Sequence, residues 1–253
     1  MGCFKVVQSS NSSACEWITR CDPPLHESSA GPLQGLSFAV KDNIDVLGMP
    51  TTAGCESFSY MPAEHSHVVH KLLTAGASLV GKTNLDQFAC GLNGTRSPWG
   101  AVPNAFDARY ISGGSSSGSA YVVATGQVDF ALGTDTAGSG RVPAGLNNIV
   151  GLKPSKGLIS ARGVVPAARS VDCVSIFARE VRLAVDVLKV AMGEDELDPF
   201  SRSLTLSQAP WPASFRFGIP DVLEFFGDDL ARQEFYRAVE MMKALGGVPT
   251  TVD

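Results

Sequence analysis

The sequence of 253 residues lacks several features that would point to particular classes of protein. It has no block of clustered Lys and Arg, and its formal net charge is −5. Binding to nucleic acid or to an anionic membrane is therefore not expected. No apolar stretch is long enough to span a bilayer, and no signal-peptide h-region stands at the N-terminus. We therefore expect a cytoplasmic protein with no membrane and no nucleic-acid partner.

Histidine is also scarce, and the cysteines show no paired pattern. The six cysteines are scattered without a C-x-x-C pair, which favours free thiols over a disulfide framework. Three of the four histidines, His65, His67 and His70, stand next to Glu64. Such spacing would suit a metal ion, but we interpret it as the solvated start of a helix whose other face is apolar. Since His26 is the only other histidine, a Ser–His–Asp triad has little support.

Short apolar runs alternate with amphipathic segments, and 44% of the residues are hydrophobic, enough for a substantial core. The alternation predicts an α/β fold in which helices flank a mostly parallel or mixed sheet. Residues 1–30 are expected to be a variable, poorly ordered lead-in, and residues 31–253 the folded part. Strands are expected at 36–40, 77–80, 130–132 and 215–219, and from about 251. Helices are expected around 68–73 and at 84–89, 120–124, 181–192 and 229–245.

The segment Gly76–Thr83 matches the pattern G-x-x-x-x-G-K-[ST] of a phosphate-binding loop. That loop needs a strand before its first glycine and a helix after its last residue. Here a predicted helix precedes Gly76, and the residues between the glycines are apolar and strand-like. We interpret the segment as helix, turn and strand, not as a nucleotide site.

Two loops rich in glycine and serine carry the strongest chemical signal. Residues 113–119 have the sequence GGSSSGS, and residues 133–140 have the sequence GTDTAGSG. A buried helix and strand stand between them, which argues against flexible linkers and suits backbone N–H groups aimed at one point. A serine nucleophile needs a base and donors for the developing oxyanion. Because no histidine is suitably placed, a buried lysine, whose pKa falls on desolvation, is the natural base.

Together with residues 39–43 (AVKDN), these loops resemble the amidase signature family, and the resemblance covers about residue 31 to the chain end. It implies the amidase signature fold and a Ser–cisSer–Lys triad. In that triad Ser139 is the nucleophile, Ser115 the proton relay and Lys41 the base, and the bond between Gly114 and Ser115 is cis.

The resemblance also implies roles for residues around the triad, and no metal or cofactor. Gly114 and Ser116 are expected to contact the substrate, and Asp135 and Arg141 to brace the nucleophile loop. Backbone N–H groups are expected to form the oxyanion hole, namely those of Thr136, Ala137, Gly138 and Ser139.

Within the family, the chain is most similar to the allophanate hydrolases, on segments such as residues 81–89 (GKTNLDQFA) and 137–141 (AGSGR). Most amidases carry a second glycine in place of Ala137 and a bulky residue in place of Gly140. The likeness implies hydrolysis of the terminal amide of allophanate (urea-1-carboxylate), with release of ammonia, during urea degradation. It also implies a functional link to a biotin-dependent urea carboxylase. The family often dimerises, so a homodimer is a further expectation.

Chains that resemble this one continue well past residue 253. We therefore expect residues 31–253 to be the N-terminal part of an amidase catalytic domain, truncated at its C-terminus. Two alternatives stay open. One is another amidase signature enzyme, such as the A subunit of a glutamine-dependent tRNA amidotransferase. The other is a truncated fragment without catalytic activity.

Overall fold

A mixed sheet organises the first of the two units into which the chain divides, Met1–Leu204, and the second unit is Thr205–Asp253. The computed structural model describes residues 5–8, 15–207, 209–210 and 212–253. Within that part of the chain, the sheet of the first unit has seven strands. Across the sheet they follow the order β1 (Lys5–Gln8), β2 (Trp17–Leu25), β4 (Ser78–Thr83), β3 (Ser37–Lys41), β5 (Phe130–Thr134), β7 (Val174–Ala178) and β6 (Val150–Leu152).

Strand β3 lies at the centre of this sheet and is parallel to both of its neighbours, β4 and β5. All other neighbouring pairs are antiparallel, so the expected mixed sheet is confirmed. Phe38, Ala39 and Val40 are completely buried, as the unbroken apolar run predicts for a strand covered on both faces. The rings of Phe38 and Phe130 stack at 5.2 Å between centroids and join β3 to β5.

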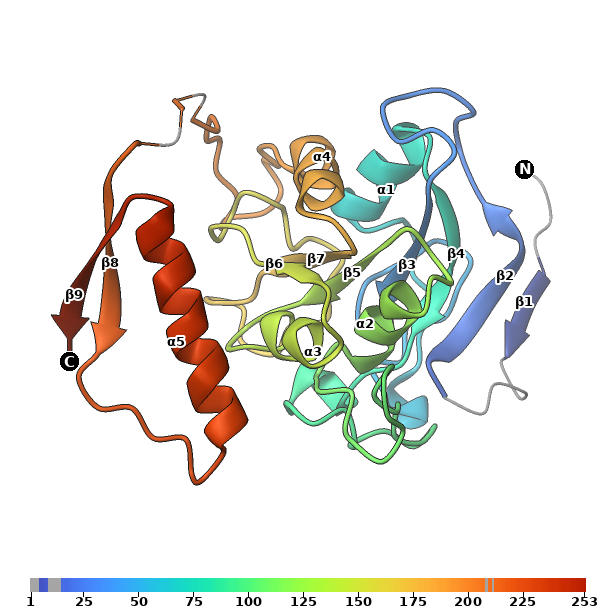
Figure 1. Ribbon diagram of the computed structural model, residues 1–253. Coiled ribbons are helices and arrows are strands. Elements are labelled where there is room, and N and C mark those ends of the chain that lie inside the picture. Colours follow the sequence, from blue (N-terminus) through green and yellow to red (C-terminus); the bar gives the residue numbers. More distant parts are fainter. Residues whose placement is uncertain (1–4, 9–14, 208, 211) are drawn as a thin grey trace. The chain divides into compact units, whose positions relative to one another are not determined.

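Helices cover both faces of the sheet (Figure 1). Helices α1 (His67–Thr74) and α4 (Val181–Ala191) pack together on one side, and α2 (Ser117–Ala124) and α3 (Arg141–Leu146) on the other. Two short 3-10 helices, η1 (Glu56–Phe58) and η2 (Gln87–Ala89), lie in the connections. Small residues bring α2 close to its neighbours, since a Cβ at Gly118 would lie 2.4 Å from the carbonyl oxygen of Glu16.

The parallel pairing of β3 and β5 determines where chemistry can take place. Val40 lies opposite Leu132, so Lys41 at the end of β3 and Thr134 at the end of β5 reach the same edge of the sheet. Ligands of open α/β sheets bind at the carboxyl ends of parallel strands. Both Gly/Ser loops stand at this edge, one leading into α2 and the other following β5.

Part of residues 1–30, expected to be a poorly ordered lead-in, belongs to the sheet. Residues 1–4 and 9–14 lie outside the described residues, but β1 and β2 are strands of the sheet, so the expectation of poor order is wrong there. Trp17, Ile18 and Cys21 on β2 are buried. Burial of these side chains against the core stabilises β2, in spite of the two prolines near its end.

The helix expected at residues 84–89 is also wrong, because only η2 forms there. Phe88 and Ala89 have φ angles of 51° and 58°, which a regular helix does not contain. The side chain of Asp86 instead accepts hydrogen bonds from the backbone N–H groups of Gly94 and Arg96, at 3.0 and 2.8 Å. By contrast, Gly76 forms a turn at a φ of 92° between α1 and β4, so the interpretation of helix, turn and strand is confirmed.

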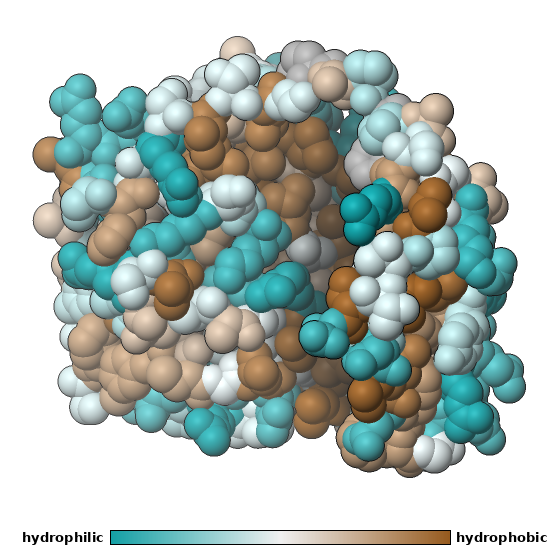
Figure 2. All heavy atoms as spheres, turned by 90° about the vertical axis from the view of Figure 1, so that its left-hand side faces the viewer, coloured by the Kyte–Doolittle hydropathy of each residue, from teal (hydrophilic) through white to brown (hydrophobic). Residues whose placement is uncertain are grey.

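The second unit contains the parallel strands β8 (Phe215–Pro220) and β9 (Gly247–Val252), joined by α5 (Asp229–Ala244). The side chain of Asp228 caps α5 by accepting a hydrogen bond from the Ala231 N–H. Strand β9 begins at Gly247, earlier than the sequence predicts. Phe226 is 92% exposed, and Figure 2 shows hydrophobic side chains exposed among hydrophilic ones on one face of the molecule. Among the described residues, no helix has the length and apolar character needed to cross a membrane.

Candidate active site

Lys41, the last residue of β3, is completely buried and points at two hydroxyl groups. Its Nζ lies 2.7 Å from Ser115 Oγ and 2.8 Å from Thr134 Oγ1. Burial lowers the pKa of Lys41 to about 7, although the carboxylates of Asp86, Asp135 and Asp172 oppose this shift. A substantial fraction of the amine is therefore neutral near pH 7 and able to accept a proton.

The loop that carries Ser115 leads into α2 and is shaped by a close backbone approach. The bond between Gly114 and Ser115 is cis, as the resemblance implies. A Cβ at Gly114 would lie 2.1 Å from Asp86 Oδ2, so only glycine fits there. The N–H of Gly114 donates to the Leu92 carbonyl at 2.7 Å, and the Ser115 carbonyl accepts from the Asp86 N–H at 3.0 Å. Asp86 thus holds the loop that presents Ser115 to Lys41.

Ser139 lies between β5 and α3 and is 4% exposed. Its carbonyl oxygen accepts a hydrogen bond of 3.2 Å from the Ser116 N–H, which brings the loop of residues 133–140 against the loop of residues 113–119. Within the described residues, the Ser139 hydroxyl forms no hydrogen bond, either to Ser115 or to another group. The structure therefore joins Lys41 to Ser115 directly, and joins Ser139 to this pair through the backbone.

The loop before Ser139 supplies fewer free donors than expected. The Gly138 N–H donates to Asp135 Oδ1 at 2.8 Å, so in this structure it has a partner within the protein. The N–H groups of Thr136, Ala137 and Ser139 form no hydrogen bond within the part of the chain that the structure describes. These three remain as candidate donors.

Asp135 is completely buried, and its carboxylate binds several groups of the loop of residues 133–140. Besides Gly138, its carboxylate accepts backbone hydrogen bonds from Gly140 and Arg141, both at 3.1 Å. The side chains of Arg141 and Lys153 approach it at 2.9 and 3.2 Å. Burial by itself would raise the pKa of Asp135, but the hydrogen bonds from Arg141, Gly138 and Lys153 lower it well below its usual range. These contacts fit the expected bracing role of Asp135 and Arg141.

The side chain of Ser116, expected to contact the substrate, forms hydrogen bonds to the backbone of Thr134. Its hydroxyl donates to the Thr134 carbonyl at 3.2 Å and accepts from the Thr134 N–H at 3.3 Å, and its side chain is completely buried. The hydroxyl is thus used within the protein, and Ser116 ties the loop of residues 113–119 to the end of β5. Its expected contact with a substrate stays a prediction.

Sequence reasoning missed two residues that touch this machinery. Thr134 accepts hydrogen bonds from both Lys41 and Asn43, the latter at 3.3 Å. Asp172 accepts a hydrogen bond of 2.6 Å from Thr136 Oγ1 and so anchors the loop with the candidate oxyanion donors. Only the position of Thr134, in the Gly/Ser loop that follows a predicted buried strand, was a signal in the sequence.

A second lysine, Lys82, is completely buried, like Lys41. Its Nζ lies 2.9 Å from Asp42 Oδ1, and neither side chain is exposed. Lys82 also donates to Thr51 Oγ1 at 2.7 Å, and Asp42 accepts from the Thr52 N–H at 3.0 Å. The lysine of the phosphate-loop pattern is therefore bound in an internal ion pair, which fixes the strand end next to Lys41.

The three clustered histidines face carboxylates. His65 and His70 lie 3.3 and 3.4 Å from Glu27, and His67 lies 3.4 Å from Asp195. The side chains of His65 and His67 are 10% and 20% exposed, so the expected solvated helix start holds only for His70. Within the described residues, no group of three or more His, Cys, Asp or Glu side chains is arranged to hold a metal ion.

Taken with this geometry, comparison with known proteins defines the class. The chain belongs to the amidase family, whose model, described as Amidase, matches residues 4–252. It is 50% identical over 224 residues to the urea amidolyase of Lachancea kluyveri, an alignment that covers 88% of this chain and 12% of the relative. It is 39% identical over 241 residues to the A subunit of the glutamyl-tRNA(Gln) amidotransferase of Methanosarcina acetivorans, covering 92% of this chain and 50% of that protein.

Comparison with a solved structure narrows the likeness to one type of enzyme within this family. The allophanate hydrolase of Kluyveromyces lactis superposes with a TM-score of 0.84 at 51% sequence identity, covering 87% of this chain and 36% of the other. The chain is therefore allophanate hydrolase-like within the amidase family. It spans half or less of the length of each of these relatives.

Proposed function

We propose that this chain carries the catalytic groups of an amide hydrolase that releases ammonia from the terminal amide of allophanate. The observation that carries the proposal is the contact between Lys41 Nζ and Ser115 Oγ, 2.7 Å long and fully buried. It places a lysine whose pKa is lowered to about 7 against a hydroxyl that can relay a proton. The likeness to the allophanate hydrolase of K. lactis supports the choice of substrate.

In the proposed mechanism, neutral Lys41 accepts the proton of Ser115 while Ser115 takes that of Ser139. Ser139 Oγ attacks the amide carbonyl carbon, and the N–H groups of Thr136, Ala137 and Ser139 stabilise the oxyanion. Each such donor is typically worth about 2.7–4 kcal/mol in the transition state. As the carbon–nitrogen bond breaks, protonated Lys41 returns a proton through Ser115 to the leaving ammonia. Water then hydrolyses the acyl-enzyme and leaves a dicarboxylate.

The proposal also places the protein within a sequence of reactions. Allophanate is the carboxylated form of urea, so a biotin-dependent urea carboxylase would supply the substrate. The 50% identity to a urea amidolyase supports this functional link. Assembly into a homodimer is a further proposal, based on the resemblance to the family.

A second candidate is glutamine hydrolysis, as in the A subunit of a tRNA amidotransferase, which the 39% identity to the M. acetivorans protein favours. The two candidates differ in substrate and share the catalytic groups. A glutaminase would act on a carboxamide that carries an α-amino acid group, whereas allophanate carries a carboxylate close to the amide.

The test is ammonia release by the purified chain from allophanate and, separately, from glutamine. Ser139→Ala is the control for the nucleophile. We expect release from allophanate that the substitution abolishes, and none from glutamine. Release from glutamine alone would favour the second candidate. If no amide is hydrolysed, the remaining alternative, a fragment without activity, would be supported.

A further inference from the structure

Lys153 stands directly after β6, the last strand in the order across the sheet of the first unit. Strand β6 approaches the start of α3 closely, since a Cβ at Gly151 would lie 2.5 Å from Ala144 Cβ and 3.2 Å from the Gly140 carbonyl oxygen. This approach brings the end of β6 beside the residues that flank Ser139. The side chain of Lys153 is 24% exposed, so most of it is covered by the protein.

The ammonium group of Lys153 donates to two acceptors in the loop of residues 133–140. One is Asp135 Oδ1 and the other is the backbone carbonyl oxygen of Thr136, each at 3.2 Å. Arg141 binds the same carboxylate, at 2.9 Å from Oδ2 and 3.0 Å from Oδ1. Among the described residues, however, only Lys153 donates to the Thr136 carbonyl. This second contact therefore separates the role of Lys153 from that of Arg141.

The carbonyl of Thr136 and the N–H of Ala137 belong to one peptide group. The bond between these residues is trans, so the C=O and the N–H point in opposite directions. A donor that fixes the carbonyl therefore also fixes the direction of the N–H. Within the part of the chain that the structure describes, the Ala137 N–H has no partner, and it is one of the three candidate donors to the oxyanion.

The groups on either side of this peptide are held by other partners. Thr136 Oγ1 donates to Asp172 at 2.6 Å, and the Gly138 N–H donates to Asp135 Oδ1 at 2.8 Å. Neither bond is made by the peptide between Thr136 and Ala137, which can rotate as a rigid plane about the single bonds on its two sides. The ammonium of Lys153 supplies the contact that these neighbours do not.

The charge of the ammonium adds to this effect on orientation. A peptide group is a dipole whose negative end is the carbonyl oxygen and whose positive end is the N–H. A cation that donates to the oxygen polarises the group and strengthens the N–H as a donor. Lys153 can therefore act on an oxyanion through the Ala137 peptide without touching the substrate.

We propose that Lys153 is a positioning residue of the oxyanion hole, which holds the peptide between Thr136 and Ala137 so that its N–H faces the oxyanion formed when Ser139 attacks. This inference rests on the proposed function and deepens it, because it adds a residue outside both Gly/Ser loops to the stabilisation of the transition state. A bond to the oxyanion is made in the transition state and not in the bound substrate. Its weakening therefore lowers kcat and leaves KM nearly unchanged.

The kinetic test measures ammonia release from allophanate by the unchanged chain and by variants of Lys153. We expect Lys153→Met and Lys153→Gln each to lower kcat roughly 10- to 100-fold, with a change in KM below about 3-fold. Two neutral replacements are used so that the comparison stands if one of them does not fold. Lys153→Arg keeps the positive charge and should recover part of the loss. A kcat within about 2-fold of the unchanged chain in the neutral variants would overturn the proposal.

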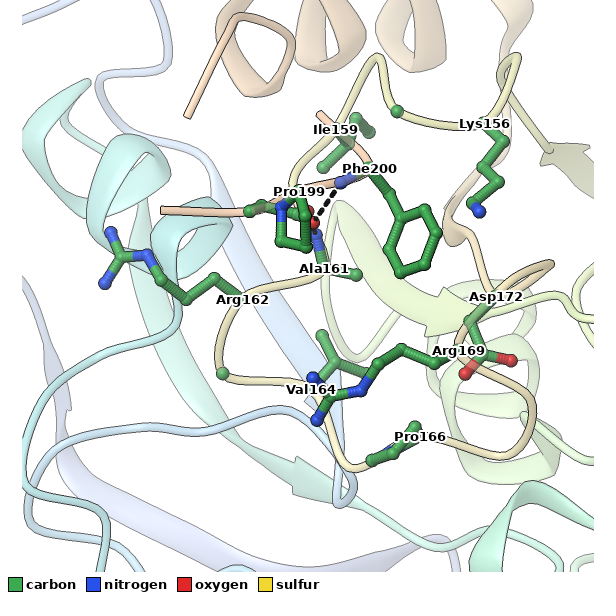
Figure 3. A pocket seen from close by; sticks show the side chains of 13 residues that line it. Lys156, Ile159, Ala161, Arg162, Val164, Pro166, Arg169, Asp172, Pro199 and Phe200 are labelled. Carbon is green, nitrogen blue, oxygen red and sulfur yellow. Dashed lines mark hydrogen bonds between the residues drawn. The ribbon is translucent and has the colours of Figure 1, made fainter. Parts of the chain in front are cut away.

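Lys156→Met is the matched control. Lys156 also donates to a backbone carbonyl, that of Ser170, but it lines a cavity of about 170 Å³ where its Nζ lies 3.7 Å from the centre of the Phe200 ring (Figure 3). It makes no contact with the loop of residues 133–140 among the described residues. We expect this variant to leave both kcat and KM unaffected, and a loss equal to that of Lys153→Met would count against the proposal.

Arg141→Met separates the contact with the carbonyl from the bracing of Asp135. It removes two hydrogen bonds to that carboxylate and leaves the contact between Lys153 and the Thr136 carbonyl in place. We expect it to lower kcat at least about 3-fold less than Lys153→Met does. If the two variants lower kcat equally, Lys153 acts through Asp135 alone and the proposal fails.

A measurement without substrate separates this inference from the proposed function. The full chain is labelled with ¹⁵N at alanine, and the amide resonance of Ala137 is identified by its loss in Ala137→Ser. We expect the neutral variants of Lys153 to shift this resonance, Lys153→Arg to shift it less, and Lys156→Met to leave it in place. That result supports the inference even if no amide is hydrolysed, in which case only the proposed function fails. An Ala137 resonance that is the same with and without the lysine overturns the inference, whatever the activity.

Discussion

Lys41 sets the pH range in which the proposed chemistry operates. Only the neutral amine can accept the proton of Ser115, and burial brings its pKa down to about 7. We expect kcat/KM to be low in acid, to rise as the pH increases through about 7, and to be level above it. A pH profile measured on malonamide, which has no titratable group of its own near neutrality, checks this. An activity that is constant from pH 5.5 to 8.5 would contradict the assignment of Lys41 as the base.

The same residue influences folding stability. Its folded-state pKa lies below that of an unfolded lysine, about 10.4, so the unfolded chain binds more protons between these two values. The contribution of Lys41 to the free energy of unfolding therefore increases as the pH rises from about 7 to about 10. Lys41→Met should remove this part of the pH dependence, raise stability near pH 7 and lower activity by about 10³-fold or more. Urea unfolding at several pH values measures the first two effects.

At the scale of elements, the start of α3 packs closely against β7. Gly140, which precedes α3, has no side chain where Ser175 of β7 fills the space. A Cβ at Gly140 would lie 2.6 Å from Ser175 Oγ and 2.8 Å from Ser175 Cβ, and Ser175 is completely buried. The absence of a side chain at Gly140 therefore makes room for a serine on the neighbouring strand.

We expect Gly140→Ala to lower the free energy of unfolding by about 1–3 kcal/mol, because the buried neighbour has no room to move. Adding Ser175→Gly should remove the clash, so that the double variant is more stable than the sum of the single changes predicts, by about 1 kcal/mol or more. Gly145→Ala, within α3, is the control and should stabilise by about 0.5–1 kcal/mol, since a Cβ at Gly145 would have no neighbouring atom within 4 Å. Additive effects in the Gly140 and Ser175 cycle would argue against the coupling.

Elements and site residues were predictable where the information is local. The apolar run of β3 gives the strand, and the segment from Ala39 to Asn43 identifies Lys41 through its resemblance to a family. The segment of β2 combines Trp17 and Ile18 with two prolines, and only its tertiary burial makes it a strand. The sequence around Asp86 has helix-forming character, but hydrogen bonds to Asp86 from the backbone of Gly94 and Arg96, in the loop that follows, override it.

The residues that contact the proposed catalytic groups could not be predicted, because these contacts are not determined by the local sequence. Asp172 stands 36 residues after Thr136, and no spacing rule connects a lone aspartate with a hydroxyl at that separation. The use of the Gly138 N–H by Asp135 depends on how the loop turns, at a φ of 135°, which its composition alone does not fix.

At the scale of the whole molecule, the two units differ in how much they bury. The central strand of the first unit has Phe38, Ala39 and Val40 at zero exposure. In the second unit, Val239 is the one buried residue of the sixteen in α5. We expect the backbone amides of α5 and β8 to exchange with deuterium faster than those of β3 and β5, because opening the second unit exposes little apolar surface. Hydrogen exchange followed by mass spectrometry measures this, and equal protection of the two units would contradict it.

The contact between Lys41 and Ser115 joins residues 74 positions apart, and the contact between Lys41 and Thr134 joins residues 93 positions apart. Both require long loops to close, which makes them late events when a chain folds from a disordered state. During synthesis, Lys41 would leave the ribosome long before its hydroxyl partners are made. Until β5 has paired with β3, the amine is solvated and carries its proton like any surface lysine. Reactivity would therefore switch on only with completion of the sheet, so an unfinished chain would not hydrolyse the amides around it.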